Sequence, residues 1–156
     1  MIAVDDPRAD DVRSLLETHL AFSYAVTPAG FAFALDVEGL CEPGVTFFSA
    51  REGGTLIGVG ALKRLDDVHA ELKSMHTREA DRGRGVGHAM VEHILAFARA
   101  HGYRRVSLET GTTEAFSPAR AFYRALGFEP CEPFGAYAQS PHNTWMTMRL
   151  DAEPSG

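Results

Sequence analysis

Apolar and polar residues alternate along several segments of the chain, a pattern typical of half-buried β-strands. Two of these segments flank Glu52-Gly53-Gly54, a short glycine turn that favours a hairpin. The segment after this turn carries Gly58 and Gly60, which indicate a bulge or the close approach of another backbone. The pattern predicts strands over residues 2–4, 45–51, 55–65, 68–77, 104–110 and 144–150.

Other segments carry apolar residues three and four positions apart, which predicts helices. The first helix is expected over residues 6–25, with Pro7 near its start and acidic residues in its first turn. The second begins at Val86, carries a wide apolar stripe and ends at His101-Gly102, where glycine is the usual stop. Residues 27–42 are ambiguous, and they favour only a short helix near residues 34–40.

A shorter helix is expected within the segment 117–128, "SPARAFYRALGF". Ser117 is its predicted N-cap, Pro118 its first helical residue and Gly127 its C-terminal cap. Helices placed along a mostly antiparallel sheet predict an α/β (α+β layered) fold. Because the 156 residues show no repeat or linker, we expect one domain over residues 1–156, with residues 151–156 as a frayed tail.

Composition excludes several classes of function. The net charge of −6 argues against a nucleic-acid-binding protein, which normally carries a basic surface. The sequence has no apolar run of about 18 residues, so no membrane span is expected, and its acidic N-terminus is unlike a secretory signal. Cys41 and Cys131 are expected as reduced thiols in the cytoplasm. No H-x-x-x-H or C-x-x-C spacing occurs, so no metal site is expected.

The segment "RGRGVG", residues 82–87, lies between a predicted strand and a predicted helix. The first amides of a helix lack intrahelical partners, and the helix dipole adds positive potential there, so such a turn can bind phosphate. Gly83, Gly85 and Gly87 let a ligand approach the backbone, while Arg82 and Arg84 could add charged donors for a diphosphate. A tight turn with solvated arginines is the alternative.

Two familiar phosphate-binding motifs do not fit this turn. A nucleotide P-loop requires a lysine that the segment lacks. A dinucleotide fingerprint requires a G-x-G-x-x-G spacing, which Gly83, Gly85 and Gly87 do not have.

The turn resembles the R/Q-x-x-G-x-G/A segment of the GNAT superfamily of N-acetyltransferases. A second element of that family, A-x-x-x-Y-x-x-x-G-F, is similar to Ala119, Tyr123, Gly127 and Phe128. The resemblance extends over residues 45–150 in the expected order. It implies a GNAT-like sheet in which strands 68–77 and 104–110 splay apart, so that the pantetheine arm of acetyl-CoA lies between them.

The resemblance also implies roles for individual positions. Main-chain groups near Met75 and Thr77 would bind the pantetheine arm, and an amide near Met75 would polarise the thioester carbonyl. The amides from Arg82 to His88, Val86 included, would bind the diphosphate. Many family members carry an asparagine where this chain has Phe116. Either Ser117 supplies a hydroxyl instead, or that contact is absent.

Acyl transfer to an amine needs a base for the amine and an acid for the thiolate. The resemblance favours Tyr123 as the acid; a tyrosine that only packs its ring on the sheet is the alternative. Glu71 is the predicted base, on the same strand face as Lys73, Met75 and Thr77 and opposite to His76. A solvated glutamate, or one paired with Lys73, is equally compatible with the pattern.

Further candidates are ranked behind these residues. His76, His69 and Glu109 are rival bases or substrate contacts. Arg120 is a phosphate contact or, more simply, a solvated side chain. Cys131 is expected in a proline-rich loop, and residues 129–143 are a candidate substrate wall.

The sequence therefore predicts an N-acetyltransferase that moves an acetyl (short acyl) group from acetyl-CoA to a primary amine of a small acceptor. Direct attack in a ternary complex is expected, with no metal, no membrane and no nucleic acid, and the protein is a candidate homodimer. A non-catalytic acyl-CoA-binding sensor or assembly module is the main alternative. A nucleotide-binding protein is the third.

Overall fold

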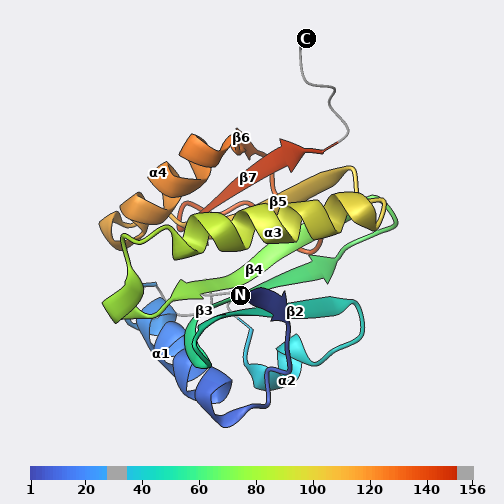
Figure 1. Ribbon diagram of the computed structural model, residues 1–156. Coiled ribbons are helices and arrows are strands. Elements are labelled where there is room, and N and C mark those ends of the chain that lie inside the picture. Colours follow the sequence, from blue (N-terminus) through green and yellow to red (C-terminus); the bar gives the residue numbers. More distant parts are fainter. Residues whose placement is uncertain (28–34, 151–156) are drawn as a thin grey trace.

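The computed structural model describes residues 1–27 and 35–150. Its centre is a seven-stranded sheet with the order β1-β2-β3-β4-β5-β7-β6 (Figure 1). All neighbouring strands are antiparallel except β4 and β5, which are parallel. The strands are β1 (Ile2–Val4), β2 (Val45–Glu52), β3 (Thr55–Arg64), β4 (His69–Thr77), β5 (Arg105–Gly111), β6 (Glu129–Cys131) and β7 (Asn143–Arg149).

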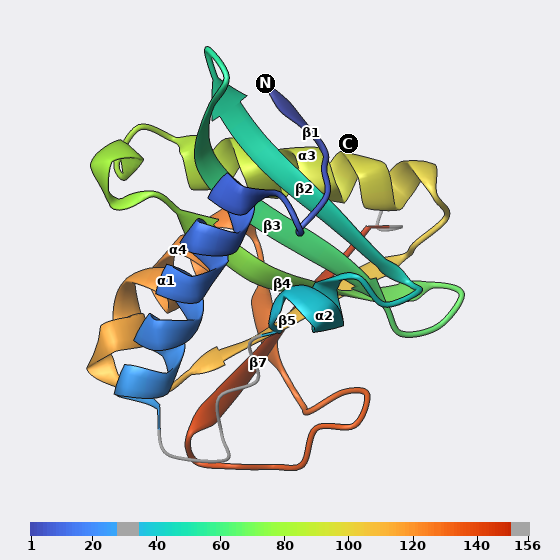
Figure 2. The same ribbon diagram turned by 90° about the horizontal axis from the view of Figure 1, so that it is seen from below.

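Helices cover both faces of this sheet. The helices α1 (Asp10–Val26) and α2 (Val37–Leu40) pack on one face, and α3 (Val86–Ala100) and α4 (Ser117–Leu126) on the other (Figure 2). Two single turns of 3₁₀-helix, Glu79–Asp81 and Glu114–Phe116, precede α3 and α4. The predicted α/β layered fold with a mostly antiparallel sheet is therefore confirmed. None of the described helices is long and apolar enough to cross a bilayer.

The first helix begins at Asp10, four residues later than predicted. Residues before it stay extended or turned, because the amide of Asp5 continues the strand pairing by donating to the carbonyl of Phe47. The Asp6 carboxylate then accepts from the amide of Arg8, which stabilises a turn through Pro7. Of the short helix predicted near residues 34–40, residue 34 lies outside the described residues, and the helix α2 begins only at Val37, after its N-cap Asp36.

The hairpin of β2 and β3 forms as predicted, and both glycines of β3 lie where side chains from β4 and α3 approach closely. A Cβ on Gly60 would come within 2.6 Å of the Met75 sulfur, and a Cβ on Gly58 within 3.0 Å of Val86. The pairing of β3 with β4 also shifts register between Val59 and Ala61. Of the two predicted alternatives, the bulge is confirmed, whereas the groups nearest to the two glycines are the side chains of Met75 and Val86 instead of another backbone.

The extra residue of this bulge belongs to β4. Val59 pairs with His76 and Ala61 with Lys73, so two steps along β3 match three along β4. Ser74 takes up the difference with a φ of 57°, in the left-handed region that only a few non-glycine residues occupy. The alternation of faces along β4 reverses at this point.

This reversal corrects the predicted arrangement of side chains on β4. Lys73 shares the α1 face with Glu71, as predicted, and so does His76, which was expected on the opposite face. Met75 instead packs into the core beneath α3. Thr77, paired with Gly58, follows Met75 to that face, and its hydroxyl lies 3.7 Å from a Cβ built on Gly87. The sequence rule of strict alternation is correct only up to Ser74.

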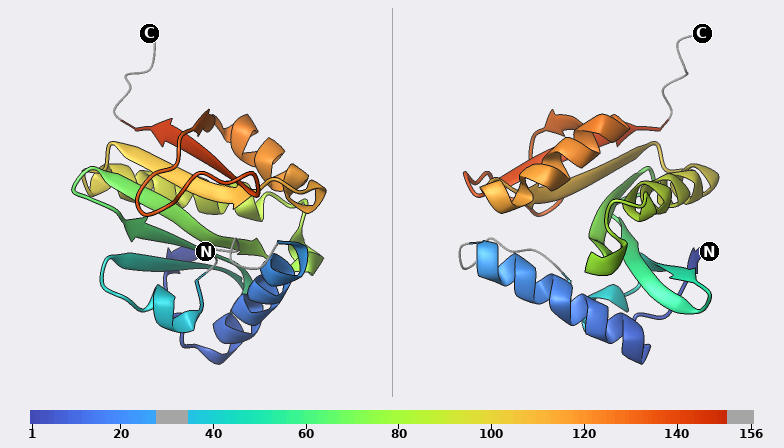
Figure 3. Two further views of the ribbon diagram at one scale, coloured as in Figure 1. Left: turned by 180° about the vertical axis from the view of Figure 1, so that it is seen from behind. Right: turned by 60° about the vertical axis from the view of Figure 1, so that its left-hand side comes forward.

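The strands β4 and β5 separate soon after they begin. They pair at His69–Arg105, Ala70–Val106 and Glu71–Ser107, and no further pairing follows in the described strands. Figure 3 shows β4 with the first half of the molecule and β5 with β7, β6 and α4. The predicted splay of the two strands is confirmed, and it places the site.

Three local predictions differ from the structure or need refinement. Gly127 caps α4 with a φ of 107°, as predicted, but Phe116 is the N-cap and Ser117 is already helical. No side chain caps this end, because the 3₁₀ turn before α4 continues into the helix. Cys131 lies in β6 instead of a loop, since residues 129–131 pair with β7. Cys41 and Cys131 are both free thiols.

Candidate active site

A cavity of about 450 Å³ opens where β4 and β5 separate. Residues from α1, both splayed strands, the turn before α3 and the start of α4 surround it. Its lining includes the predicted residues Glu71, Met75, Arg82 and Tyr123, so the fold brings these together from distant parts of the chain. Ser117 is exposed and Thr77 is half-buried, and neither lines the cavity.

We call the glycine-rich segment at the start of α3, residues 82–88, the turn end. Two of its glycines have a left-handed backbone conformation. Gly83 has a φ of 80° and Gly85, the N-cap, a φ of 82°. A Cβ at either position would meet no atom within 4 Å, so the backbone lies open there. Among the described residues, the amides from Gly83 to His88 have no internal acceptor; Ala89 is the first whose amide donates within the helix, to Gly85.

The two arginines of the turn differ in what they contact. Arg84 donates to the carboxylates of Asp81 and Glu52, at 2.6 and 2.7 Å, so its guanidinium is engaged on the side of the turn. Arg82 donates through Nε to the carbonyl of Thr77 at 3.2 Å and also lines the cavity. Of the two predicted charged donors, Arg82 is therefore the one directed towards the cavity.

These features suit a diphosphate bound to the turn end. Open amides at the start of a helix, a left-handed glycine N-cap and a nearby arginine are the groups that bind phosphate oxygens. The adjoining cavity gives room for the attached arm, since β4 and β5 do not pair along it. The side chains of Val86 and His88 do not contribute to this phosphate-binding arrangement. Val86 packs on the core, and the ring of His88 lies 3.6 Å from the carboxylate of Glu92.

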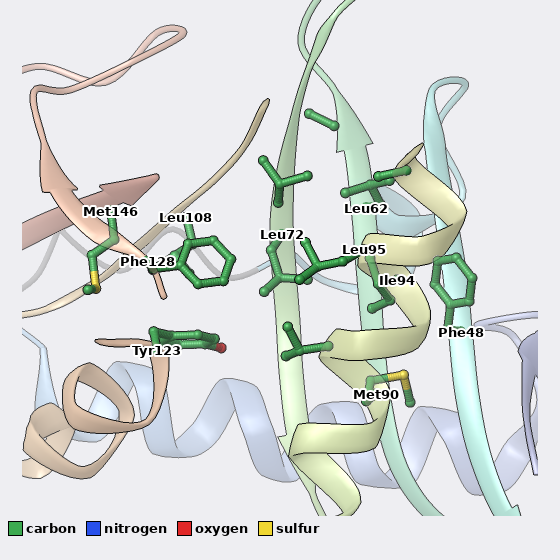
Figure 4. Packing of buried hydrophobic residues seen from close by; sticks show 14 of the residues in the cluster. Phe48, Leu62, Leu72, Met90, Ile94, Leu95, Leu108, Tyr123, Phe128 and Met146 are labelled. Atoms are coloured by element: carbon green, nitrogen blue, oxygen red, sulfur yellow. The ribbon is translucent and has the colours of Figure 1, made fainter. Parts of the chain in front are cut away.

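Tyr123 lies on α4 with its ring in the core and its hydroxyl turned towards the strand that carries Leu72 (Figure 4). The ring makes edge contacts with Phe122 and Phe128, which hold it in place. Burial raises the pKa of the Tyr123 phenol well above its ordinary value of 10. The phenol therefore keeps its proton at neutral pH, and the residue both packs and lines the cavity.

Glu71 is buried on β4 in the last residue pair that joins β4 to β5, and its carboxylate is itself paired. One oxygen accepts from the hydroxyl of Tyr137 at 2.6 Å and lies 3.3 Å from the ammonium of Lys73. The ammonium also donates to the Tyr137 hydroxyl at 3.0 Å. The side chains of Glu71 and Lys73 are only 4% and 8% exposed, so the solvated alternative is wrong and the ion pair is confirmed.

Glu109, on β5, lies on the same face of the sheet as Glu71. Its carboxylate accepts from the side-chain amide of Asn143 at 2.9 Å. Burial raises the pKa of Glu109 above its ordinary range, against the opposing effects of the Asn143 hydrogen bond and the charge of Lys73. We call Glu71, Lys73, Glu109 and Tyr137 the carboxylate end of the site.

Two histidines that line the cavity contact each other. The Nδ1 atoms of His19, on α1, and His76 lie 3.3 Å apart, so one ring donates and the other accepts. Burial lowers the pKa of each to about 4, helped for His19 by His76 and for His76 by Arg82. His69, another predicted rival base, instead contacts the Ser107 hydroxyl at 2.7 Å and does not line the cavity.

Some lining residues were not singled out by the sequence. His19 and Phe22 lie one turn apart on α1, a spacing that places them side by side. Phe22 meets Phe116 edge to face with ring centres 5.6 Å apart. Phe116 stands where many family members carry asparagine, and its ring lies against Gly111, where a Cβ would come within 2.3 Å.

Arg120 was weighed as a phosphate contact or a solvated side chain. Its guanidinium instead donates to the carbonyls of Gly111 and Thr113, at 2.8 and 2.9 Å. It therefore holds the loop between β5 and α4. From the segment predicted as a substrate wall, residues 129–143, Tyr137 belongs to the carboxylate end and Asn143 donates to Glu109 there.

Comparison with known proteins agrees with this geometry. Residues 13–128 match the acetyltransferase (GNAT) family. The chain is 42% identical over 149 residues to an N-acetyltransferase of Bacillus subtilis (strain 168) called YsnE, covering 96% of this chain and 99% of that protein. It is 34% identical over 150 residues to the IAA acetyltransferase of Azospirillum brasilense, covering 96% and 97%.

Solved structures share the fold at lower identity. An acyl-CoA N-acyltransferase from Klebsiella pneumoniae has a TM-score of 0.79 at 21% identity, over 96% of this chain and 97% of that one. An aminoglycoside 6'-N-acetyltransferase complexed with coenzyme A has a TM-score of 0.73 at 16% identity, over 99% of both chains. The predicted family is confirmed: this chain is an acyltransferase of the GNAT family.

Proposed function

We propose that this protein transfers an acetyl group from acetyl-CoA to a primary amine of a small acceptor, by direct attack within a ternary complex. The observation that carries the proposal is the continuity of the site. Arg82, at the start of the turn end, lines the cavity between β4 and β5, and the carboxylates of Glu71 and Glu109 line the same cavity. The open amides follow Arg82 directly in the chain. A thioester bound along this path, from the turn end into the cavity, would reach towards Glu71 and Glu109.

Each end of the path supports a different part of the reaction. The amides from Gly83 to His88 and the guanidinium of Arg82 would hold the diphosphate. Main-chain groups of β4 beyond Glu71 are not paired with β5, so they are available to the pantetheine arm and the acyl carbonyl. Acetyl-CoA supplies the acyl group as an activated thioester: an N–C bond forms, the C–S bond breaks, and the amine loses protons.

Tyr123 is proposed to act as the acid towards the departing sulfur. Its phenol stays protonated at neutral pH because burial raises its pKa, and it lines the cavity from α4. Such a phenol can stabilise the departing thiolate by donating a hydrogen bond to it, while the raised pKa of the phenol opposes complete transfer of the proton. That Glu71 removes a proton from the acceptor stays a prediction, and one of its oxygens is shared by Lys73 and Tyr137.

The test is turnover. Purified protein is incubated with acetyl-CoA and a panel of primary amines, and release of free thiol is measured. We expect thiol release that depends on the amine and saturates with it. Tight binding of coenzyme A in titration calorimetry without turnover on any acceptor would instead support the acyl-CoA sensor.

A further inference from the structure

We propose that this protein acetylates its own chain, and that Lys73 is the lysine it modifies. The inference rests on the proposed binding of acetyl-CoA and adds a modification site to the proposed function. Lys73 lies on β4, lines the cavity and has a side chain that is only 8% exposed. Its amine, itself a primary amine, therefore borders the space proposed for the thioester and is largely withdrawn from bulk solvent.

The position of Lys73 along β4 is the first reason. Among the described residues, β4 pairs with β5 only as far as Glu71, opposite Ser107. Lys73 follows Glu71 by two residues on the same face of the sheet, so it lies beyond the point where the strands separate. Its side chain thus starts within the splay, where the acyl group of a thioester bound along the cavity would lie.

The contacts of the Lys73 ammonium are the second reason. Its Nζ atom lies 3.3 Å from a carboxylate oxygen of Glu71 and donates to the Tyr137 hydroxyl at 3.0 Å. These two partners hold the end of a flexible side chain in one place, which favours reaction with a bound thioester. The Glu71 carboxylate is also close enough to take the proton that the nitrogen must lose before it attacks.

The proposed step balances within this ion pair. Lys73 passes one proton to Glu71, and its uncharged nitrogen attacks the thioester carbonyl. The N–C bond forms, the C–S bond breaks, and coenzyme A leaves as a thiolate that takes up the second proton lost by the nitrogen. The product is an amide beside a neutral carboxylic acid, so no uncompensated charge stays buried where the ion pair was.

The composition of the chain also singles out Lys73. Of the 15 lysine and arginine residues, only Lys63 and Lys73 are lysines. Arginine keeps its proton in proteins, so Arg82, which also lines the cavity, does not react with a thioester. Lys63 lies on β3 and does not line the cavity. Lys73 is therefore the one lysine of the chain placed beside the proposed acyl group.

The test incubates the purified wild-type protein with acetyl-CoA and no added acceptor. Peptide mapping by mass spectrometry follows acetylation of Lys73 and of Lys63, which is the internal control. We expect Lys73 to react about 100-fold faster than Lys63, because it is held beside the bound thioester. The rate at Lys73 should saturate with acetyl-CoA, stay the same when the protein is diluted, and fall when coenzyme A is added as a competitor.

Variants show what the modification does. Because the added acetyl group would occupy the cavity, turnover of the wild-type protein on a free amine should fall about 10-fold after this incubation. Lys73→Arg keeps a cation beside Glu71 but cannot be acetylated, so its own turnover should not fall further during the incubation. Lys63→Arg should behave as the wild type does. Coenzyme A affinity by titration calorimetry shows that each variant is folded.

The outcomes separate this inference from the proposed function. Faster acetylation of Lys63, or a rate at Lys73 that rises in proportion to protein concentration, would overturn self-acetylation within one chain. Protein that acetylates free amines but leaves Lys73 unmodified would also overturn it, while the proposed function stands. Acetylated Lys73 without turnover on any free amine would instead support the inference and overturn the proposed small acceptor.

Discussion

The two ends of the cavity are built in opposite ways. The turn end is a run of neighbouring residues, 82–88, that presents backbone amides, and only Arg82 adds a side chain towards the cavity. The carboxylate end is assembled from β4, β5 and the loop before β7, with side chains up to 66 residues apart in sequence, as for Glu71 and Tyr137. Backbone amides can bind one common phosphate group with few constraints on residue type. A cluster of side chains can vary without moving the strands, so this end is the one suited to select the acceptor.

The largest effect is expected from damage to the turn end. Combining Arg82→Ala with Gly85→Asp removes a charged donor and places a carboxylate among the open amides. Each lost charge-assisted contact is worth about 2 kcal/mol, so we expect coenzyme A to bind roughly 1000-fold more weakly. Titration calorimetry with coenzyme A measures the change.

Gly53→Asp is the matched control for this variant. Gly53 also has a positive φ, 58°, and open space around it, but it lies in the β2–β3 turn. It should suffer similar backbone strain while binding coenzyme A normally. Unchanged affinity in the double variant would remove the turn end from the proposed site.

The next effect concerns stability at the carboxylate end. Lys73→Met leaves the buried Glu71 carboxylate without its cation, and removing one partner of a buried pair typically costs about 3 kcal/mol or more. We expect this loss in the free energy of unfolding measured with urea. Adding Glu71→Gln to Lys73→Met should recover at least half of it.

The control is Lys63→Met, since Lys63 is the other lysine of the chain and the register partner of Glu71 on β3. Among the described contacts it forms no ion pair, so its replacement should change stability by less than about 0.5 kcal/mol. Similar losses for both lysines would show that the pair with Glu71 is not what stabilises this end.

The contrast between the ends also explains what the sequence could predict. The turn end was readable because its signal, three glycines and two arginines before an apolar helix, lies within a few residues. The side-chain faces of β4 could not be predicted in the same way. Ser74 adopts a left-handed φ, which is uncommon for serine, and this reverses the face on which each later side chain of the strand lies. Nor does any local pattern show that Tyr137 reaches Glu71 or that His19 meets His76. Such contacts depend on how distant elements pack.

Tyr123 lines the same cavity from α4, and its replacement should separate chemistry from binding. Tyr123→Phe keeps the ring contacts with Phe122 and Phe128 and removes only the hydroxyl. We expect kcat to fall about 100-fold, roughly 2.7 kcal/mol, with coenzyme A affinity within about 2-fold. Tyr103→Phe, at a partly buried tyrosine packed on the same core, should leave both unchanged. Parallel losses in kcat and affinity for Tyr123→Phe would indicate a packing role alone.

The smallest effect is a dependence of stability on pH at the histidine pair. The folded-state pKa of His19 and of His76 is about 4, below the ordinary value of 6.5. The unfolded chain therefore binds more protons between these values, so stability is complete above pH 6.5 and is lost as pH falls towards 4. Because both rings are partly accessible, we expect a loss of about 1 kcal/mol for each ring, seen as a lower urea midpoint at pH 5 than at pH 7.

Replacing one histidine of the pair tests whether the pair causes this pH dependence of stability. In His76→Gln the glutamine can still face His19 but does not titrate, so the difference between the two pH values should shrink by about half. His101→Gln, at the exposed end of α3, should keep the full difference. If the two variants behave alike, the acid sensitivity comes from elsewhere. The contact of His19 with His76, which joins α1 to β4, would then not depend on uncharged rings.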